Sequence, residues 1–284
     1  MEEIQESYIE CENLVKEHYE NFTIGSWFLP KDYRKSLYAI YAFCRTADDI
    51  GDSLSKNSNN KLKNLDNLET EIYKCYNKNY TPKNPFMIAL QHTINEFEID
   101  IEPFLKLIEA NRIDQKKIRY NNFQELEHYC RHSANPVGHL VLNIFGYKDD
   151  VRKKLSDSIC TALQLTNFLQ GIKYDYNLGR IYIPKEDMQI FNCTEEDLVN
   201  PNIIPNFIKL MEFQTNRAYT LFKKGEGLFP LITRRFRIDL RLFSFGGVKI
   251  LNKIKSNGYD VINNQIKLSK KDKLSLIFKA IISK

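Results

Sequence analysis

The most chemically suggestive stretch is an apolar helical pattern, residues 37–52, that ends in three carboxylates. Four of its polar side chains are spaced by four, three and four residues and so share one helix face: Tyr41, Arg45, Asp48 and Asp52. Two aspartates one turn apart repel each other, which costs about 0.2–0.5 kcal/mol on a solvated helix. The same pair can bind a divalent cation, because Mg²⁺ prefers oxygen ligands. A solvated acidic face is the structural alternative.

A second polar stripe lies within the stretch 164–184, where Gln164, Asn167, Gly171 and Asp175 step by three, four and four. Amides on such a stripe would be unsatisfied in a plain core, but they can hold water, metal-bound oxygens or an anionic head group. The segment GRIYIP follows and brings Arg180 into the loop after the helix. Because guanidinium groups match phosphate oxygens bidentately, this pattern suggests a metal-bridged phosphate ligand.

The elements that must position these side chains are helices. Residues 123–146 give a helical pattern that Pro136 and Gly138 should kink or break. Strand signals are nearly absent, and no repeat or long linker divides the chain, so we expect one all-α domain, residues 1–284. Helical periodicity predicts the other helices at 3–20, over a long segment ending near 52, and at 61–79, 86–97, 101–114, 150–175, 205–230, 239–257 and 270–283.

Length and charge limit the class of protein. The chain has 284 residues, and its 43% hydrophobic content can bury a substantial core. There are 41 basic and 36 acidic residues, and the basic excess is concentrated in residues 209–255. A mild basic bias suits an anionic ligand or an anionic membrane surface. No recognised nucleic-acid-binding module is visible, so nucleic acid is not indicated as a partner.

Cysteine usage and the N-terminus bear on location. The six cysteines are widely scattered and show no C-x-x-C pair, which indicates a reducing compartment. The acidic start of the chain lacks the pattern of a secretory signal, and no stretch approaches the length of a membrane span. We therefore expect a cytoplasmic protein, with peripheral contact to the inner face of a membrane left open. His128 and His132 lie one turn apart, but without a third ligand a packing role is favoured over zinc.

Several blocks in order resemble the squalene/phytoene synthase family: YAFCRTADDIGD, YCRHSANPVGHLVL, LQLTNFLQ with the later GRIYIP, and DLRLFSFGGVKILNKIKSNGYDV. The blocks HYENFTIGSWFLP and SANPVG are more similar to the hydroxysqualene synthase branch of bacterial hopanoid biosynthesis than to the phytoene branch. The resemblance covers nearly the whole chain, from His18 to Lys279. It implies an isoprenoid-synthase fold, a single helical bundle around a central cavity.

The resemblance also implies roles for individual residues. In the family, two aspartate-rich helices bind Mg²⁺ ions that hold a substrate diphosphate, and the matching metal ligands are Asp48, Asp52 and Asp175. Catalytic roles fall on these aspartates and on Tyr41, Tyr129 and Asn167. Substrate-binding roles fall on His18, Ser26, Arg45, Gln164, Gly171 and Arg180.

The reaction implied by this branch starts from presqualene diphosphate. The diphosphate leaves, and water captures the rearranged cation to give hydroxysqualene. Head-to-head condensation of two farnesyl diphosphates, to presqualene diphosphate or squalene, is the enzymatic alternative. No dinucleotide-binding fingerprint is present, which agrees with capture by water rather than by hydride. No protein partner is indicated.

Two places depart from the family pattern. Gly171 stands where the second acidic motif, D-x-x-x-D, has its first aspartate, so that only Asp175 remains. Glycine inside a helix is about 1 kcal/mol less favourable than alanine, so helix stability does not explain it. Asn264 and Gln265 stand where basic residues are expected. A catalytically silent homologue that binds prenyl lipid is therefore a third reading of the chain.

Overall fold

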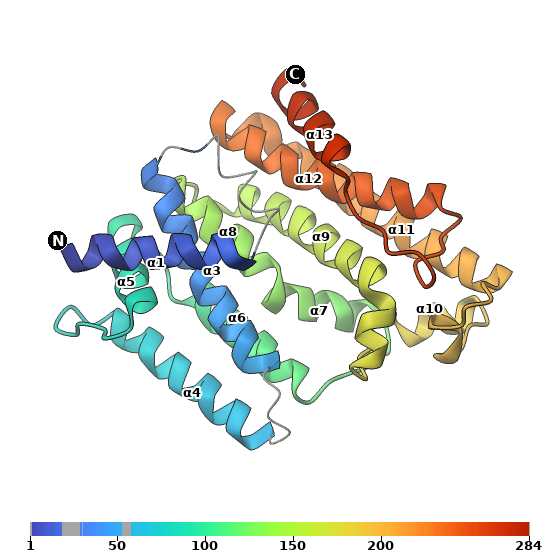
Figure 1. Ribbon diagram of the computed structural model, residues 1–284, viewed down its shortest axis with the longest axis horizontal. Coiled ribbons are helices and arrows are strands. Elements are labelled where there is room, and N and C mark those ends of the chain that lie inside the picture. Colours follow the sequence, from blue (N-terminus) through green and yellow to red (C-terminus); the bar gives the residue numbers. More distant parts are fainter. Residues whose placement is uncertain (1, 19–28, 30, 53–57, 284) are drawn as a thin grey trace. The chain divides into compact units, whose positions relative to one another are not determined.

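The computed structural model describes residues 2–18, 29, 31–52 and 58–283, and within these ranges every regular element is a helix (Figure 1). The all-α prediction is confirmed. The first eight α-helices are α1 (Glu2–His18), α3 (Lys31–Asp52), α4 (Ser58–Cys75), α5 (Pro85–Phe97), α6 (Glu102–Asp114), α7 (Phe123–Ser133), α8 (Asn135–Ile144) and α9 (Asp150–Asn177). The remaining elements are α10 (Lys185–Ile190), the 3₁₀ helix η1 (Glu196–Leu198), α11 (Pro205–Gly225), the 3₁₀ helix η2 (Glu226–Leu231), α12 (Arg234–Ser256) and α13 (Lys270–Ile282).

The chain divides into two compact units. Unit 1 consists of Met1–Lys116 and His132–Lys153, and unit 2 consists of Lys117–Arg131 and Lys154–Lys284. Each predicted stripe therefore lies in its own unit, with α3 in unit 1 and the relevant part of α9 in unit 2. The expectation of a single domain stays a prediction.

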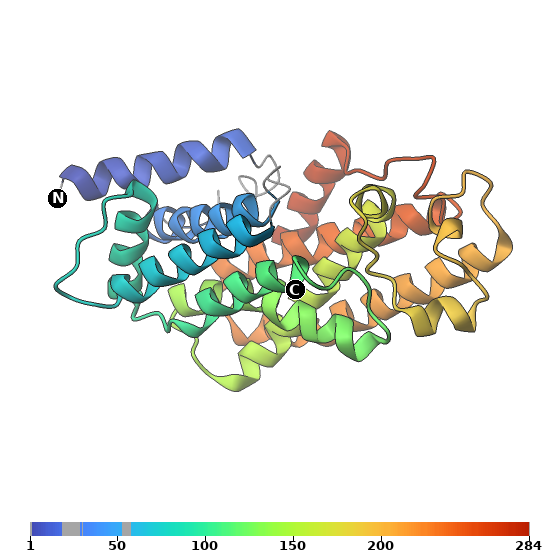
Figure 2. The same cartoon turned by 90° about the horizontal axis from the view of Figure 1, so that it is seen from below.

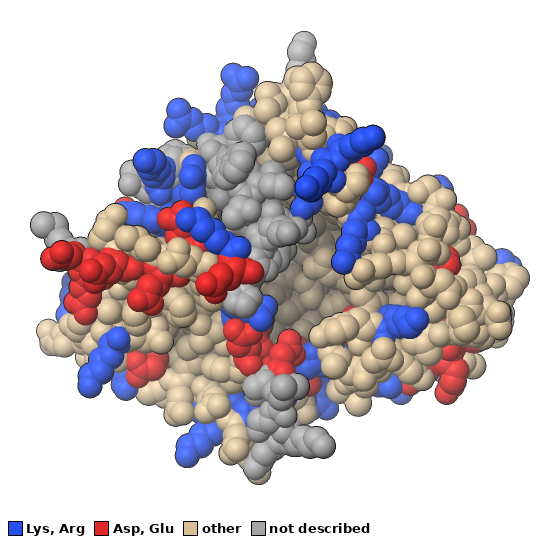
Figure 3. Space-filling model, in the orientation of Figure 1, with Lys and Arg blue, Asp and Glu red and all other residues tan. Residues whose placement is uncertain are grey.

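Unit 1 is organised around α3, which contacts α1, α4, α5, α6 and α8. Figures 1 and 2 show α1 lying across α3 and α5, and Figure 3 shows acidic side chains gathered over α1. The apolar face of α3 is buried as the sequence predicts, and the ring of Phe43 packs edge-on against Phe104 of α6 at 5.0 Å between centroids. Burying one face of α3 fixes the direction of its polar face.

Unit 2 contains most of α9, together with α11, α12 and α13 packed in succession (Figure 1). A Cβ atom at Gly247 of α12 would lie 2.4 Å from the ring of Phe222 on α11. Glycine at this position therefore allows the two helices to approach closely. Elsewhere on these two helices Phe207, Leu251 and Ile254 are each fully buried in the core of the unit.

The structure confirms the predicted break in 123–146 and moves several of the predicted helix boundaries; α12, for example, begins at Arg234 rather than at 239. The predicted break in 123–146 occurs at Ala134, and Pro136 lies in the first turn of α8, where its missing N–H is harmless. The predicted helix 205–230 ends at Gly225 and continues as the 3₁₀ helix η2. The short elements α10 and η1 were not predicted, because six and three residues are too few to show a helical period.

Candidate active site

The acidic end of α3 is the first candidate site, and it lies in unit 1. The last two turns of the helix carry three exposed carboxylates, those of Asp48, Asp49 and Asp52. The final turn contains no basic residue. Carboxylates at a helix C-terminus face the negative end of the helix dipole, which is unfavourable. This cluster is therefore poor helix design in the absence of a cation.

Asp48 has the most perturbed carboxyl group of this cluster. Solvent reaches it, but the protein crowds it enough that desolvation raises its pKa to about 6. The nearby charges of Asp52 and Asp114 also raise the pKa, whereas a hydrogen bond from Asn111 and the charge of Arg45 lower it. A carboxyl group whose pKa is raised by desolvation and by neighbouring acids is a natural place for a divalent cation.

Asn111 of α6 connects that helix to the acidic end of α3. Its Nδ2 donates to Asp48 Oδ1 at 3.3 Å and to the Leu107 carbonyl at 3.2 Å. A Cβ atom at residue 51 would lie 2.2 Å from Asn111 Oδ1, so the amide requires Gly51. Asn111 and Asp114 were not predicted from the sequence, although Gly51 within an otherwise helical pattern was an available signal.

The carbonyl oxygen of Gly51 holds the end of α3 to the neighbouring helices. It accepts hydrogen bonds from Lys61 Nζ of α4 at 3.0 Å and from Gln115 Nε2, directly after α6, at 3.2 Å. Carbonyls in the last turn of a helix have no partner within the helix. Lys61 and Gln115 supply hydrogen-bond partners for the Gly51 carbonyl, and they fix the turn that carries Asp48 and Asp52.

The other members of the α3 stripe have different surroundings. Arg45 forms an ion pair with Asp49 at 2.6 Å between nitrogen and oxygen. Tyr41 is half-buried and packs against the small apolar cluster formed by α1, α3 and α5. The structure thus confirms the shared helix but gives Arg45 a nearest partner, Asp49, that the sequence stripe did not include.

The polar stripe of α9 is the second candidate site, and it lies in unit 2. Asn167 is exposed and Gln164, Gly171 and Asp175 are half-buried, in contrast to the buried apolar positions between them. A Cβ atom at Gly171 would meet only Asp175 Oδ2, at 3.4 Å, which is an ordinary van der Waals contact. The helix therefore has room for a side chain at this position.

The turn that ends α9 brings the backbone of Arg180 back to that of Asp175. Gly179 has a φ of 79°, its N–H donates to the Tyr176 carbonyl, and the Arg180 N–H donates to the Asp175 carbonyl, each at 2.8 Å. This is the Schellman arrangement, in which glycine adopts the left-handed conformation at no steric cost. Asp175 and Arg180 border one small cavity. That these two residues bind a metal-bridged phosphate stays a prediction.

An aromatic cluster lies beside this cavity. Phe168 of α9 and Tyr182 stack with ring centroids 3.9 Å apart and planes inclined by 8°. Tyr129 of α7 lies 5.7 Å from Tyr182 and 6.2 Å from Phe168, and Tyr120 lies 5.7 Å from Tyr129. Tyr129 was predicted from the resemblance, but its aromatic neighbours were not, because they come from separate segments of the chain.

The loop that departs from the family pattern is held by its own polar groups. Asn264 Nδ2 donates to Asp260 Oδ2 at 2.8 Å, and Gln170 and Lys173 of α9 donate to the carbonyls of Ile266 and Ile262. The amide at position 264 therefore fixes the loop, where a basic residue would offer a charge to an anion. Gln265 is exposed.

Some predicted residues are not brought into either site. Ser26 and the side chain of His18 lie outside the described residues. His128 is exposed and His132 is half-buried, and they fall in different units. In the part of the chain that the structure describes, no three His, Cys, Asp or Glu side chains are close enough to hold a metal by themselves. None of the described helices is long and apolar enough to cross a bilayer.

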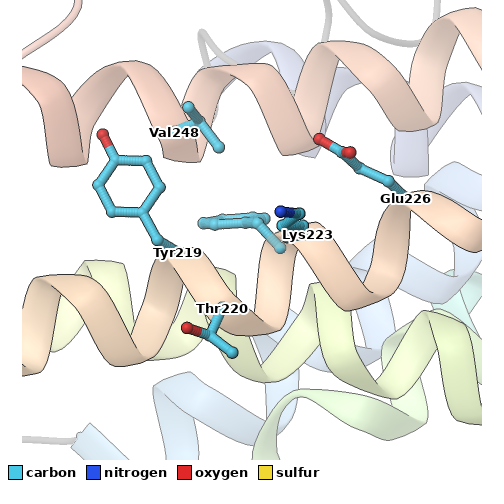
Figure 4. Close-up of a pocket in the computed structure, with 6 residues that line it drawn as sticks. Tyr219, Thr220, Lys223, Glu226 and Val248 are labelled. Atoms are coloured by element: carbon cyan, nitrogen blue, oxygen red, sulfur yellow. The ribbon is translucent and has the colours of Figure 1, made fainter.

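A larger cavity, of about 450 Å³, lies between α11 and α12 and contains none of the predicted site residues (Figure 4). Its wall carries a single carboxylate, that of Glu226, and a single ammonium group, that of Lys223. Val248 projects into it from α12, and Tyr219 lies at the opposite end from Glu226. With one acid and no arginine, this cavity does not suit a metal-bridged diphosphate.

Comparison with known proteins identifies the family of the chain. The model of the squalene/phytoene synthase family matches residues 15–272. A phytoene synthase from Arthrospira platensis is 32% identical over 277 residues, which cover 92% of this chain and 87% of that protein. The phytoene synthase of Synechocystis is 29% identical and covers 92% of this chain and 80% of its own length.

Two solved structures support the same assignment. The squalene synthase HpnC from Alicyclobacillus acidocaldarius superposes with a TM-score of 0.85 and 40% identity, covering 91% of this chain and 97% of that one. A dehydrosqualene synthase superposes with a TM-score of 0.90 and 29% identity, covering 98% and 96%. The higher identity to HpnC agrees with the bacterial branch that the sequence blocks resemble. The chain belongs to the squalene/phytoene synthase family, whose members process prenyl diphosphates.

Proposed function

We propose that this chain is a Mg²⁺-dependent enzyme that converts presqualene diphosphate to hydroxysqualene by ionisation of the diphosphate and capture of the cation by water. The observation that carries the proposal is Asp48, a carboxyl group whose pKa is raised to about 6 at the crowded acidic end of α3. A bound cation would offset both the repulsion among these acids and their position at the negative end of the helix dipole. The 40% identity to HpnC supports the choice of branch.

The donor set fits Mg²⁺, because this ion usually takes one or two carboxylates and completes its shell with water and substrate phosphate. Asp48 and Asp52 would hold it in unit 1, and Asp175 is the acid proposed for the same role in unit 2. When bound, the ion stabilises the charge that develops on a departing diphosphate. Asn111 holds Asp48 in place through its Nδ2 atom.

The other residues act on the substrate directly in this proposal. Arg45 and Arg180 donate to diphosphate oxygens, and Ser26 and His18 do so from segments of the chain not described. Gln164 and Asn167 position polar atoms along α9, and Tyr41 lines the substrate side of α3. The rings of Tyr129, Phe168 and Tyr182 form an apolar wall that excludes water, and a carbocation over an uncovered ring face gains about 0.5–2 kcal/mol.

Two alternatives have specific support. Relatives named as phytoene and dehydrosqualene synthases favour head-to-head condensation of two prenyl diphosphates. Gly171, which leaves the second acidic motif with one carboxylate, favours a silent homologue that binds prenyl lipid. The proposed hopanoid role places the enzyme in the cytoplasm at the inner face of the membrane.

The test is turnover by the purified chain. With presqualene diphosphate and saturating Mg²⁺ it should release diphosphate and form hydroxysqualene, and Asp48→Asn should lower the rate at least about 100-fold. The matched control is Asp100→Asn, which neutralises an exposed acid outside both candidate sites and should leave the rate unchanged. Squalene or presqualene diphosphate formed from farnesyl diphosphate would favour condensation. Saturable lipid binding with no diphosphate release under any condition would favour the silent homologue.

A further inference from the structure

The outward face of α13 is apolar and exposed. Leu274, Phe278, Ile281 and Ile282 have exposed fractions of 70%, 66%, 39% and 60%. Their spacing of four, seven and eight residues from Leu274 places them on one helix face. The opposite face carries Leu276 and Ala280, which are buried where α13 packs on α12. We call the exposed set the α13 stripe. The helix therefore has one apolar face in the core and a second one in solvent.

Basic side chains surround the α13 stripe. Lys270 and Lys271 are exposed in the first turn of α13. At its other end a cavity of about 280 Å³ is lined by three arginines of α12 together with Ile281 and Ile282 of the stripe. We call this the three-arginine cavity, after Arg234, Arg237 and Arg241. Figure 3 shows blue side chains on both sides of the tan surface at this end of unit 2.

The single acidic residue of α13 is turned away from this face. Asp272 forms a capping box with Ser269 and pairs with Lys249 at 3.4 Å and Lys253 at 2.6 Å. Its charge is thus neutralised by α12, and the outward face of α13 keeps only positive charges. An apolar stripe flanked by basic side chains is the pattern of a helix that lies in the interface of an anionic membrane.

We propose that the α13 stripe and the three-arginine cavity together dock unit 2 on an anionic lipid bilayer. The stripe enters the boundary between head groups and acyl chains, and the exposed side chains of Arg234, Lys270 and Lys271 contact lipid phosphates. A second copy of the chain is a poorer occupant, because a two-fold contact would bring identical basic groups together. The sequence places the basic excess at 209–255, whereas the exposed apolar side chains of this surface lie on α13.

The experiment is co-sedimentation of the purified full chain with vesicles. Wild type should bind vesicles containing about 30% phosphatidylglycerol at least tenfold more tightly than phosphatidylcholine alone, and high salt should weaken this binding. Leu274→Asp combined with Phe278→Asp should reduce binding at least tenfold. Ile190→Asp is the matched control, because Ile190 is 66% exposed on α10 and lies outside the docking surface.

The contribution of charge is tested separately. Arg234→Gln combined with Lys271→Gln should abolish the preference for anionic vesicles, whereas Lys209→Gln, on the exposed side of α11, should not. Phe278→Ser provides a milder variant if the aspartates impair folding. The proposal is overturned if wild type ignores anionic vesicles or if the stripe variants bind them normally. It is equally overturned if those variants only convert a dimer to a monomer, which would make the stripe a contact between copies.

Discussion

Asn111 donates to Asp48 with one end of its amide and lies against Gly51 with the other. A side chain of α6 thus contacts two positions of α3. One is the carboxylate proposed to hold Mg²⁺, and the other is the glycine one turn beyond it. The amide can reach Asp48 only because residue 51 has no Cβ atom. The position of Asp48 therefore depends on a residue 63 positions away in the chain.

Substitution Gly51→Ala should disturb this contact. A methyl group 2.2 Å from Asn111 Oδ1 must displace the amide, and we expect a loss of about 1–3 kcal/mol in unfolding free energy. In an Asn111→Ala background the clash is absent, so the same substitution should be neutral or stabilising by up to about 1 kcal/mol. Chemical denaturation of the four proteins measures the coupling. Equal losses in both backgrounds would show that Asn111 does not impose the glycine.

Asp48→Asn should stabilise the metal-free chain at neutral pH. The pKa of Asp48 is raised from 3.8 to about 6 in the folded chain, so the folded state holds the proton to a higher pH than the unfolded state. The unfolding free energy due to Asp48 therefore falls as pH rises from about 4 to about 6, and changes little above. Because solvent reaches this carboxylate, we expect a gain of about 1 kcal/mol, or about 2–4 °C in Tm.

Thermal unfolding in a chelator, at a series of pH values, checks this prediction. The difference in Tm between Asp48→Asn and wild type should appear above about pH 6 and vanish near pH 4. Asp100→Asn serves again as the control for removing one negative charge. A variant less stable than wild type at pH 7 would mean that Asp48 is stabilised in its charged form, against the pKa shift.

Mg²⁺ binding should weaken in acid. The proposed ligand must lose its proton before it binds, so apparent affinity should fall about tenfold per pH unit below the pKa of about 6. Isothermal titration with Mg²⁺ and inorganic diphosphate from pH 5 to 8 would record the change and the accompanying proton release. An affinity that stays constant across this range would exclude Asp48 as a ligand.

Two substitutions at Gly171 separate helix stability from charge. Gly171→Ala should add about 1 kcal/mol to the unfolding free energy, because the helix has room for the methyl group. Gly171→Asp should place a second carboxylate beside Asp175 and so raise turnover at limiting Mg²⁺. If both variants have the turnover of wild type, Asp48, Asp52 and Asp175 suffice. If only the aspartate raises turnover, Gly171 limits the proposed site.

Gly179→Ala should affect both stability and substrate binding. Alanine at a φ of 79° costs about 1–2 kcal/mol, and relief of that strain would move Arg180 away from Asp175. Gly146 offers a matched control, since its φ is 77° and a Cβ atom there also meets nothing within 4 Å. Gly146→Ala should lose similar stability but keep its KM for prenyl diphosphate. A raised KM in both variants would point to general loosening rather than to Arg180.

Local pattern was enough to predict α3, the α9 stripe and the break near Pro136, because each depends on residues within a few helical turns. Contacts between helices cannot be predicted from a local sequence pattern. Three features of this kind depend on how segments pack together. They are the hydrogen bond from Asn111 to Asp48, the stacking of Phe168 on Tyr182 and the exposure of the second apolar face of α13. Gly51 was the one visible trace of such a contact, as a poor helix former inside a helix.

The order of the two units along the chain has a consequence for synthesis. Unit 1 is interrupted by residues 117–131 and is completed only by 132–153, which include α8. A nascent chain emerging from the ribosome must therefore present α7 before the last helix of unit 1 is available. Fragments that stop at Lys116 would expose the apolar surface of α3 and α6 that α8 covers. Chaperone capture, rather than early independent folding, is the expected fate of such a fragment.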